Sequence, residues 1–241
     1  MKAIAVSLVV VSLLGVGAYA QVTINLGVAD DFAVLGSTGV TNVSNKTYII
    51  GDVGSYPTCT VTGLTQSQVK GDLFLQCNTL TQEAQTDLAV AYGQAAGATC
   101  DTDLTGRNLG GMKLDPGVYC FKTAARLKGT LTLDALGNPG AQWVFQVGTT
   151  LNADKDSHVV MLLGHQQPPW KTGARGCNVY WQVGSTATIG ASSVFVGKIL
   201  AQNNIVINGG IFKGKSLTTS GAVKLLHKER INGPACNGTE D

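Results

Sequence analysis

The sequence predicts an all-β fold of stacked coils, a β-solenoid, with one α-helix packed alongside. Its composition favours strands and tight turns, because 31 of the 241 residues are glycine and lysine and glutamate are sparse. Only 13% of the residues are charged, against about 25% in an ordinary soluble domain, which argues against a helical bundle. Short strand-like segments recur at a fixed interval, and a single segment has helical spacing instead.

The recurring segments set the length of one coil. The tripeptides at 187–189, 205–207 and 223–225 (Ala-Thr-Ile, Ile-Val-Ile and Val-Lys-Leu) repeat at an offset of 18 residues. A longer similarity, between residues 143–148 and 179–184, has an offset of 36, which we interpret as two such periods. A period this short excludes propeller blades of about 40 residues and is typical of a β-helix.

One segment, about 80–97, predicts an α-helix. Its apolar residues fall three and four positions apart, and the segment contains no proline and ends at a candidate C-cap glycine, Gly97. The apolar stripe consists of Leu80, Ala84, Leu88, Ala91 and Ala95. Because the stripe is mostly alanine, we expect the helix to lie close against a β face.

The first 20 residues have the pattern of a secretory signal peptide. Lys2 precedes an apolar run at 4–16, and Ala18-Tyr19-Ala20 is a small-x-small cleavage pattern. The run falls short of the roughly 20 residues that span a bilayer. We therefore expect a secreted protein with a single domain at 21–241, which is extracellular and not inserted in a membrane.

Six cysteines in a secreted chain predict a disulfide framework. No Cys-x-x-Cys pair or cysteine–histidine spacing indicates a metal site. Fifteen pairings are possible, and we favour near neighbours: Cys59 with Cys77, Cys100 with Cys120, and Cys177 with Cys236. Asn-x-Ser/Thr patterns mark Asn42, Asn45 and Asn237 as candidate glycosylation sites, which predicts that all three lie on the surface.

The sequence contains no signature of catalysis. There is no nucleophile elbow, zinc-protease pattern or phosphate-binding glycine loop in the mature chain. The formal net charge is +2, from 17 basic and 15 acidic residues, which argues against nucleic acid or an anionic membrane as a partner. We expect a protein that is not an enzyme and that needs no cofactor.

Five segments, in order, resemble the signature segments of the secreted ice-binding protein family found in cold-adapted fungi, algae and bacteria. They are NLGVADDFAVLG at 25–36, IGDVG at 50–54, AYGQAAG at 91–97, LDPGVY at 114–119 and WVFQVG at 143–148. The resemblance extends from about Asn25 to about Ile231. It implies a right-handed β-solenoid of triangular section, with one α-helix along its side and the first coil beside the last.

The geometry of a solenoid indicates where such a protein would contact ice. Outward side chains form a lattice with about 6.8 Å along a strand and about 4.8 Å between strands. Small or β-branched side chains there have few rotamers, so the face can order water at little entropic cost. Counting in coils from the 18-residue repeat predicts an outward row of Thr132, then Asn152 or Thr150, then Thr188, Val206 and Lys224.

A second indication is the segment Thr38-Gly39-Val40-Thr41, which is similar to the T-A/G-x-T/N pattern of ice-binding faces in the family. Together the two observations give a set of candidate ice-binding residues: Thr38, Thr41, Thr132, Thr150, Asn152, Thr188 and Val206. The resemblance implies an antifreeze protein that adsorbs to ice, limits crystal growth and inhibits recrystallisation. We expect it to be a monomer.

Two alternative functions stay open at this point. A carbohydrate-binding or carbohydrate-active β-solenoid would need clustered aspartates with arginine or lysine along a groove, and the sequence shows no such cluster. A structural or adhesive secreted solenoid without ice activity would have the same sequence features as an ice-binding protein. An assay of ice-crystal shape distinguishes an ice-binding protein from such a structural or adhesive solenoid.

Overall fold

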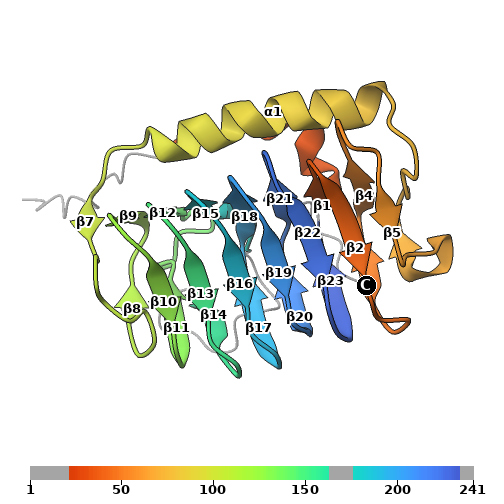
Figure 1. Cartoon of the computed structure of the whole chain (residues 1–241). Helices are drawn as coiled ribbons and strands as arrows, with labels where there is room; N and C mark the ends of the chain where they lie inside the picture. The colour runs from red at the N-terminus through yellow and green to blue at the C-terminus, as the bar shows by residue number, and fades with distance from the viewer. Residues whose placement is uncertain (1–21, 163–175, 234–241) are drawn as a thin grey trace, which may run out of the picture.

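Three parallel β-sheets form the sides of a triangular solenoid, and one helix lies along it (Figure 1). The structure is a computed structural model that describes residues 22–162 and 176–233. In spatial order, sheet A contains β4 (Asp52–Ser55), β1 (Phe32–Gly36), β21 (Ser216–Thr218), β18 (Lys198–Ala201), β15 (Val179–Val183), β12 (Trp143–Val147), β9 (Gly117–Phe121) and β7 (Thr102–Asp103).

The other two sheets are built in the same way. Sheet B contains β10 (Ala125–Leu127), β13 (Leu151–Ala153), β16 (Ala187–Ile189), β19 (Ile205–Ile207), β22 (Ala222–Leu225), β2 (Gly39–Asn42) and β5 (Val61–Thr62). Sheet C contains β6 (Val69–Lys70), β3 (Tyr48–Ile50), β23 (Glu229–Asn232), β20 (Gly210–Lys213), β17 (Ser193–Val196), β14 (His158–Leu162), β11 (Thr130–Asp134) and β8 (Lys113–Leu114). Short 3₁₀ turns occur at Gly27–Asp30 (η1), Gln66–Gln68 (η2) and Gly176–Asn178 (η4).

The first coil of the chain stacks directly on the last, as expected. Strands β1, β2 and β3 pair in parallel with β21, β22 and β23. Figure 1 shows the orange N-terminal strands beside the blue C-terminal ones, with helix α1 (Thr79–Ala96) carrying the chain to the opposite end of the stack. The chain then returns coil by coil from β7 to β23.

The coils differ in length, which corrects one interpretation of the repeat. Thr188 pairs with Val206 and Val206 with Lys224, so the 18-residue period is confirmed there. Trp143, however, pairs directly with Val179, so the 36-residue offset is one long coil and the interpretation as two periods is wrong. The extra residues are inserted between strands, where added chain length does not disturb the pairing.

Aromatic rings stack along the solenoid interior. Trp143 and Trp181 have no exposed surface. The Trp181 ring lies 3.9 Å from that of Phe145, at an interplanar angle of 9°, and 5.1 Å from that of Phe195. Tyr119 and Phe212 extend the stack at its two ends. These rings therefore form a continuous aromatic column within a core that is otherwise mostly aliphatic.

Helix α1 covers sheet A through a second apolar core. Ala84, Leu88, Ala91 and Ala95 are fully buried and pack with apolar residues of sheet A. The helix begins after Asn78, whose side chain accepts a hydrogen bond from the Thr81 N–H (2.9 Å), and its C-cap is Gly97. The predicted helix is confirmed, except that Leu80 is 46% exposed and Thr81 takes the buried position.

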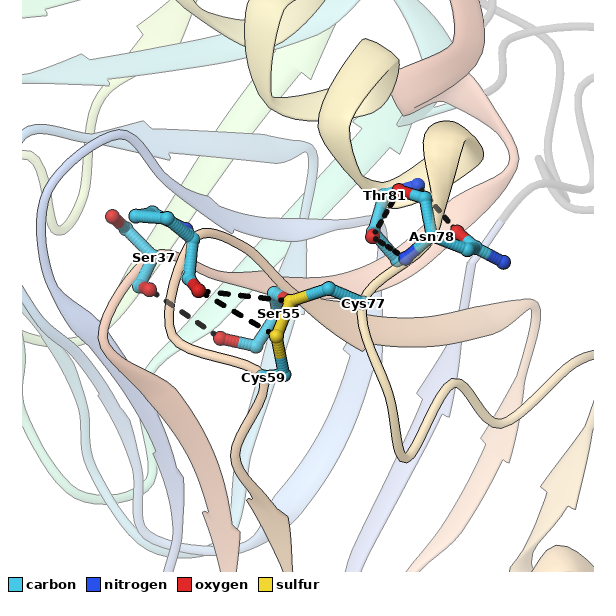
Figure 2. Close-up of a disulfide and its surroundings, with 7 residues drawn as sticks. Ser37, Ser55, Cys59, Cys77, Asn78 and Thr81 are labelled. Carbon is cyan, nitrogen blue, oxygen red and sulfur yellow. Dashed lines mark hydrogen bonds between the residues drawn. A yellow bond between two sulfur atoms is a disulfide. The ribbon is translucent and has the colours of Figure 1, made fainter.

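Two of the three predicted disulfides are confirmed. Cys59 is bonded to Cys77 and Cys100 to Cys120, with Cα–Cα distances of 5.0 and 5.9 Å. Figure 2 shows the Cys59–Cys77 bridge beside the start of helix α1, close to Ser37 and Ser55. The third predicted pair includes Cys236, which lies outside the described residues.

A buried carboxyl group makes stability depend on pH. Glu229 is 1% exposed and accepts hydrogen bonds from the N–H groups of Leu226 and His227 (2.9 and 3.2 Å). Burial raises the pKa of Glu229 from 4.5 to about 7. Because the folded pKa lies above the ordinary value, folding takes up a proton between these two pH values. The free energy of unfolding should therefore fall as pH rises through this window, by at most about 3 kcal/mol.

The test is urea unfolding of the disulfide-bonded protein at several pH values between 5 and 7.5. The Glu229→Gln variant should show a flatter dependence of the free energy of unfolding on pH. Burial lowers the pKa of Lys215 to about 8, so this second buried group titrates above the window. Equal slopes for wild type and variant would contradict the assignment to Glu229.

Candidate functional site

The outward residues of sheet B form one continuous row, which we call the central row. Each short strand of sheet B turns one residue outward, which is the middle residue of the three-residue strands β10, β13, β16 and β19, and parallel pairing aligns these outward residues across the sheet. In spatial order the central row contains Arg126, Asn152, Thr188, Val206, Lys224, Thr41 and Thr62. Neighbouring members stand about one strand spacing apart, about 4.8 Å.

The packing beneath the central row keeps it regular. Ala187 and Ile189, on either side of Thr188, point inward and are buried. The same alternation holds in β19, where Ile205 and Ile207 are buried on either side of Val206. Slipping a strand by one residue would expose these apolar side chains, so burial fixes the register of the face.

A second row, the corner row, lies three residues earlier in each coil, where the chain turns from sheet A into sheet B. Its members are Thr123, Thr149, Ser185, Asn203, Gly221, Thr38 and Cys59. Hydrogen bonds between coils connect it: Thr149 N–H donates to the Thr123 carbonyl (3.3 Å), and the Asn203 side-chain amide donates to the Ser185 hydroxyl (3.2 Å). Thr38 N–H donates to the Gly221 carbonyl (2.9 Å).

The Thr38-Gly39-Val40-Thr41 segment is therefore one instance of a spacing that every coil of sheet B repeats. Thr38 and Thr41 are both exposed, and Thr41 accepts a hydrogen bond from the Thr62 hydroxyl (3.4 Å). Thr62 and most of the corner row are not among the residues predicted from the sequence. Scanning for small polar residues three positions before each outward residue would have found Thr149, Ser185 and Asn203.

Thr132 does not belong to the central row, so its predicted place there is wrong. It lies on β11 in sheet C, where it pairs with Lys113 and Val160. Counting back in units of 18 fails because Arg126 pairs with Asn152 across a coil of different length. Arg126 takes the position that we assigned to Thr132.

The other predicted members lie on or beside this face. Asn152 and Thr188 pair directly, and Thr188 pairs with Val206. Thr150 is half-buried one position before β13, and its hydroxyl accepts a hydrogen bond from the Asn152 amide (3.2 Å). Of the two alternatives for this coil, Asn152 is the one in register.

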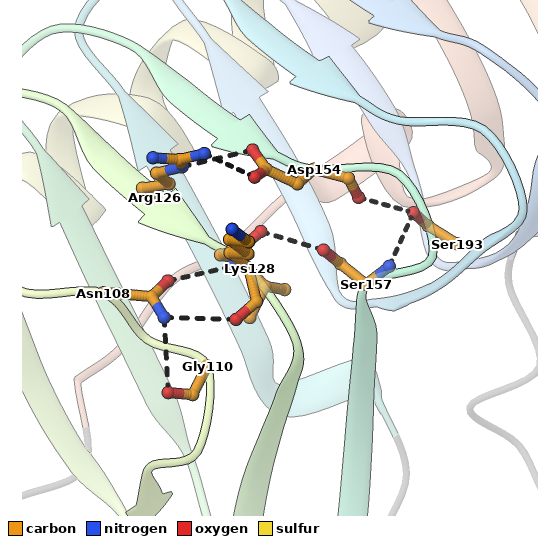
Figure 3. Close-up of polar contacts among 8 residues, drawn as sticks. Asn108, Gly110, Arg126, Lys128, Asp154, Ser157 and Ser193 are labelled. Atoms are coloured by element: carbon orange, nitrogen blue, oxygen red, sulfur yellow. Dashed lines mark hydrogen bonds and ion pairs between the residues drawn. The ribbon is translucent and has the colours of Figure 1, made fainter.

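Polar side chains close the β10 end of the face, as Figure 3 shows. The Asn108 side chain hydrogen-bonds both the N–H and the carbonyl of Lys128 (2.8 and 3.1 Å), in the manner of an additional strand. Arg126 forms an ion pair with Asp154 at 2.6 Å, and the hydrogen bond from Arg126 lowers the pKa of Asp154. The Arg126 charge, which stands in the central row, is therefore paired.

Lys224 is the charge that interrupts the middle of the central row. Its side chain is exposed between Val206 and Thr41. Within residues 22–162 and 176–233, no carboxylate forms an ion pair with it. An ammonium group binds its own hydration shell strongly, so this position is the least suited to an ordered water layer.

Asn42 is buried, which corrects its predicted surface position. Its side-chain amide donates to the Ser44 and Gly63 carbonyls (both 2.6 Å), and its Oδ1 accepts from the Thr47 hydroxyl (2.7 Å). The nitrogen that would carry a glycan is thus fully used inside the fold. Asn45 is exposed, and Asn237 lies outside the described residues.

The described residues do not form a metal site or a membrane-spanning helix. In the two described ranges, no three His, Cys, Asp or Glu side chains come together as a metal site. Over the same part of the chain, no helix is both long and apolar enough to cross a bilayer. Asp103 accepts a hydrogen bond from the Thr105 N–H (2.8 Å) and pairs with Lys122 at 3.1 Å, so it stabilises its own loop.

A β-solenoid with one broad, regular, mostly uncharged face and a helix on another side is the class of protein that the fold defines. A family description, ice-binding-like, matches residues 34–232. A curated ice-binding protein of Nostoc sp. (strain HG1) is 39% identical over 202 residues, which are 83% of this chain and 71% of the relative. The chain belongs to this ice-binding-like family.

Solved structures agree with the sequence comparisons. An ice-binding protein from an Antarctic biological consortium is 31% identical, with a TM-score of 0.79 over 88% of this chain and 92% of that one. An ice-binding protein from an Arctic yeast, whose structure was described for its antifreeze activity, is 27% identical, with a TM-score of 0.77 over 92% of this chain and 98% of the yeast protein.

Proposed function

We propose that this chain is an extracellular antifreeze protein that adsorbs to ice through sheet B, and that it acts as a monomer without enzymatic activity. The observation that supports the proposal most is the alignment of seven strands, which brings five uncharged central-row residues into one lattice. They are Asn152, Thr188, Val206, Thr41 and Thr62.

The lattice suits ice because it is both regular and stiff. Thr188 and Val206 are β-branched and sit on strands whose inner neighbours are buried, so their side chains lose little freedom when water orders over them. Many weak contacts then act together, and a growing crystal cannot easily overgrow the adsorbed protein. The corner row provides hydroxyl and amide groups beside this surface.

The test is to observe single ice crystals just below freezing in the presence of the purified, disulfide-bonded protein. We expect faceted crystals, a gap between melting and growth temperatures, and inhibited recrystallisation. Unshaped discs and unchanged recrystallisation with a folded protein would refute the proposal. That result would favour the alternative of a structural or adhesive secreted solenoid.

Removing the charge at Lys224 should strengthen the activity. In the Lys224→Thr variant, the central row runs without a charge from Asn152 to Thr62, so ordered water can extend across β22. Stability should change by less than about 0.5 kcal/mol, because the side chain is exposed and unpaired among the described residues. The measurement is thermal hysteresis beside a thermal melt.

The matched control is Lys213→Thr, which removes the same charge from an exposed position on sheet C. It should leave thermal hysteresis unchanged. If Lys224→Thr leaves the activity unchanged or lowers it, contact with ice does not extend over this part of sheet B.

A further inference from the structure

Unpaired positive charges gather on one end of sheet C and its corner with sheet B. Five exposed side chains make up this group, which we call the basic patch: Lys46, Lys70, Lys213, Lys228 and Arg230. Across the described residues, none of the five forms an ion pair with a carboxylate. The patch does not overlap the central row.

The register of sheet C brings these residues together. Lys213 pairs with Asn232, Asn232 with Ile50, and Ile50 with Lys70, so the two lysines lie in one outward row. Three strand spacings separate them, about 14 Å. Arg230 pairs with Tyr48, and Lys228 and Lys46 each come two residues before that pair, at the corner with sheet B. Figure 1 shows β20 and β23 side by side at this end of the solenoid.

Acidic groups do not neutralise the patch. Glu229 lies between Lys228 and Arg230 in sequence, but its side chain is buried and turned away from the surface. Asp72 lies two residues beyond Lys70, where the chain turns toward sheet A. Two buried lysines outside the patch do have a carboxylate partner: Lys198 lies 2.8 Å from the Asp30 carboxylate, and Lys215 lies 3.6 Å from it.

The sequence shows the same asymmetry on a larger scale. Residues 157–239 contain a single acidic residue, Glu229. Their basic residues are Lys171, Arg175, Lys198, Lys213, Lys215, Lys224, Lys228 and Arg230. The chain is therefore nearly neutral overall, but its net positive charge is concentrated in its C-terminal part. Like charges on neighbouring strands repel each other, so the patch has an electrostatic cost that a bound polyanion would remove.

We infer that the basic patch binds an acidic polysaccharide, a linear polymer of carboxylate-bearing or sulfate-bearing sugars. The flat outer surface of sheet C, with cations spaced by strand intervals, fits an extended polymer that lies across the strands. Tyr48 is 39% exposed between Arg230 and the last strand of the sheet, and its ring offers an apolar face to a sugar ring.

The residue types favour this polymer over nucleic acid. Single-stranded nucleic acid is bound by stacking successive bases on several aromatic rings. Among the described residues, Tyr48 is the one exposed Phe, Tyr or Trp side chain on the strands that carry the basic patch. The inference is independent of ice binding, because it concerns a different face.

The experiment measures binding of polygalacturonate to the full disulfide-bonded protein by titration calorimetry. Dextran serves as an uncharged polysaccharide, and duplex DNA and vesicles of an anionic phospholipid serve as other polyanions. We expect polygalacturonate to bind most tightly, with an affinity that falls as salt is added, and dextran not to bind. Failure to bind polygalacturonate, or tighter binding of DNA or vesicles, would overturn the inference.

Two variants with equal charge loss locate the site. Lys213→Gln, Lys228→Gln and Arg230→Gln together should weaken polygalacturonate binding at least tenfold. The control combines Arg107→Gln, Lys122→Gln and Lys128→Gln, exposed positions at the opposite end of the solenoid, and should change it less than twofold. If both triple variants weaken polygalacturonate binding equally, the polymer responds to the net charge of the protein and not to the basic patch, and the inference is wrong. The first variant should keep its ice activity, which separates this result from a failure of the proposed function.

Discussion

Replacing Thr188 by tyrosine should remove most of the inhibition of ice recrystallisation while leaving the protein folded. Thr188 stands between Asn152 and Val206 in the uncharged part of the central row. A tyrosine ring there would hold the flat face away from an ice plane and break many weak contacts at once. A loss of about 1.4 kcal/mol in adsorption corresponds to roughly a tenfold higher protein concentration for the same inhibition.

The fold should tolerate the change because nothing buried is altered. Ala187 and Ile189 provide the buried side chains of β16, and the Thr188 side chain points outward. The matched control is Thr132→Tyr, the same substitution at an outward position of sheet C. Recrystallisation assays beside thermal melts should show a loss for the first variant alone. Full activity in a folded Thr188→Tyr protein would place the ice contact on another face.

Removing Trp181 should produce the largest loss of stability. The ring is fully buried between Phe145 and Phe195, and its indole N–H donates to the Val196 carbonyl (3.0 Å). Trp181→Ala leaves a cavity in the aromatic stack and an unpaired carbonyl, so we expect a loss of about 3–5 kcal/mol. That loss is a large share of the roughly 5–15 kcal/mol by which a domain is stable.

Chemical denaturation with intact disulfides measures this effect. Trp181→Phe is the control, because it keeps an aromatic ring in the stack and removes the hydrogen bond and part of the volume. It should cost clearly less than the alanine variant. A loss below about 1 kcal/mol for Trp181→Ala would show that the aromatic stack does not determine stability.

The sequence was sufficient to predict the fold and the coils of uniform length. The helix follows from its three- and four-residue spacing. The alignment of Thr188, Val206 and Lys224 follows from the 18-residue repeat, since β16, β19 and β22 repeat without insertions. Prediction failed where insertions change the coil length, as for Thr132. Pairing between coils is set by the inward side chains, such as Leu151 on Ala187, and not by the number of residues between them.

The burial of Asn42 illustrates a second limit of sequence patterns. An Asn-x-Ser pattern shows that an amide is present, but not whether the fold already uses it. Here Thr47, itself part of the next such pattern, donates its hydroxyl to Asn42 and closes a loop. Only the three-dimensional path of residues 42–47 determines which of the two asparagines remains accessible.

The length of helix α1 is matched to the number of coils in the solenoid. Its 18 residues span about 27 Å at 1.5 Å per residue, and the eight strands of sheet A span seven intervals, about 34 Å. The helix and its flanking residues must connect the β4 end of this sheet to the β7 end. Each further coil would therefore require about three more helical residues. Members of such a fold can gain or lose coils only if the helix or the residues that flank it change length with them, so the two parts are expected to evolve together.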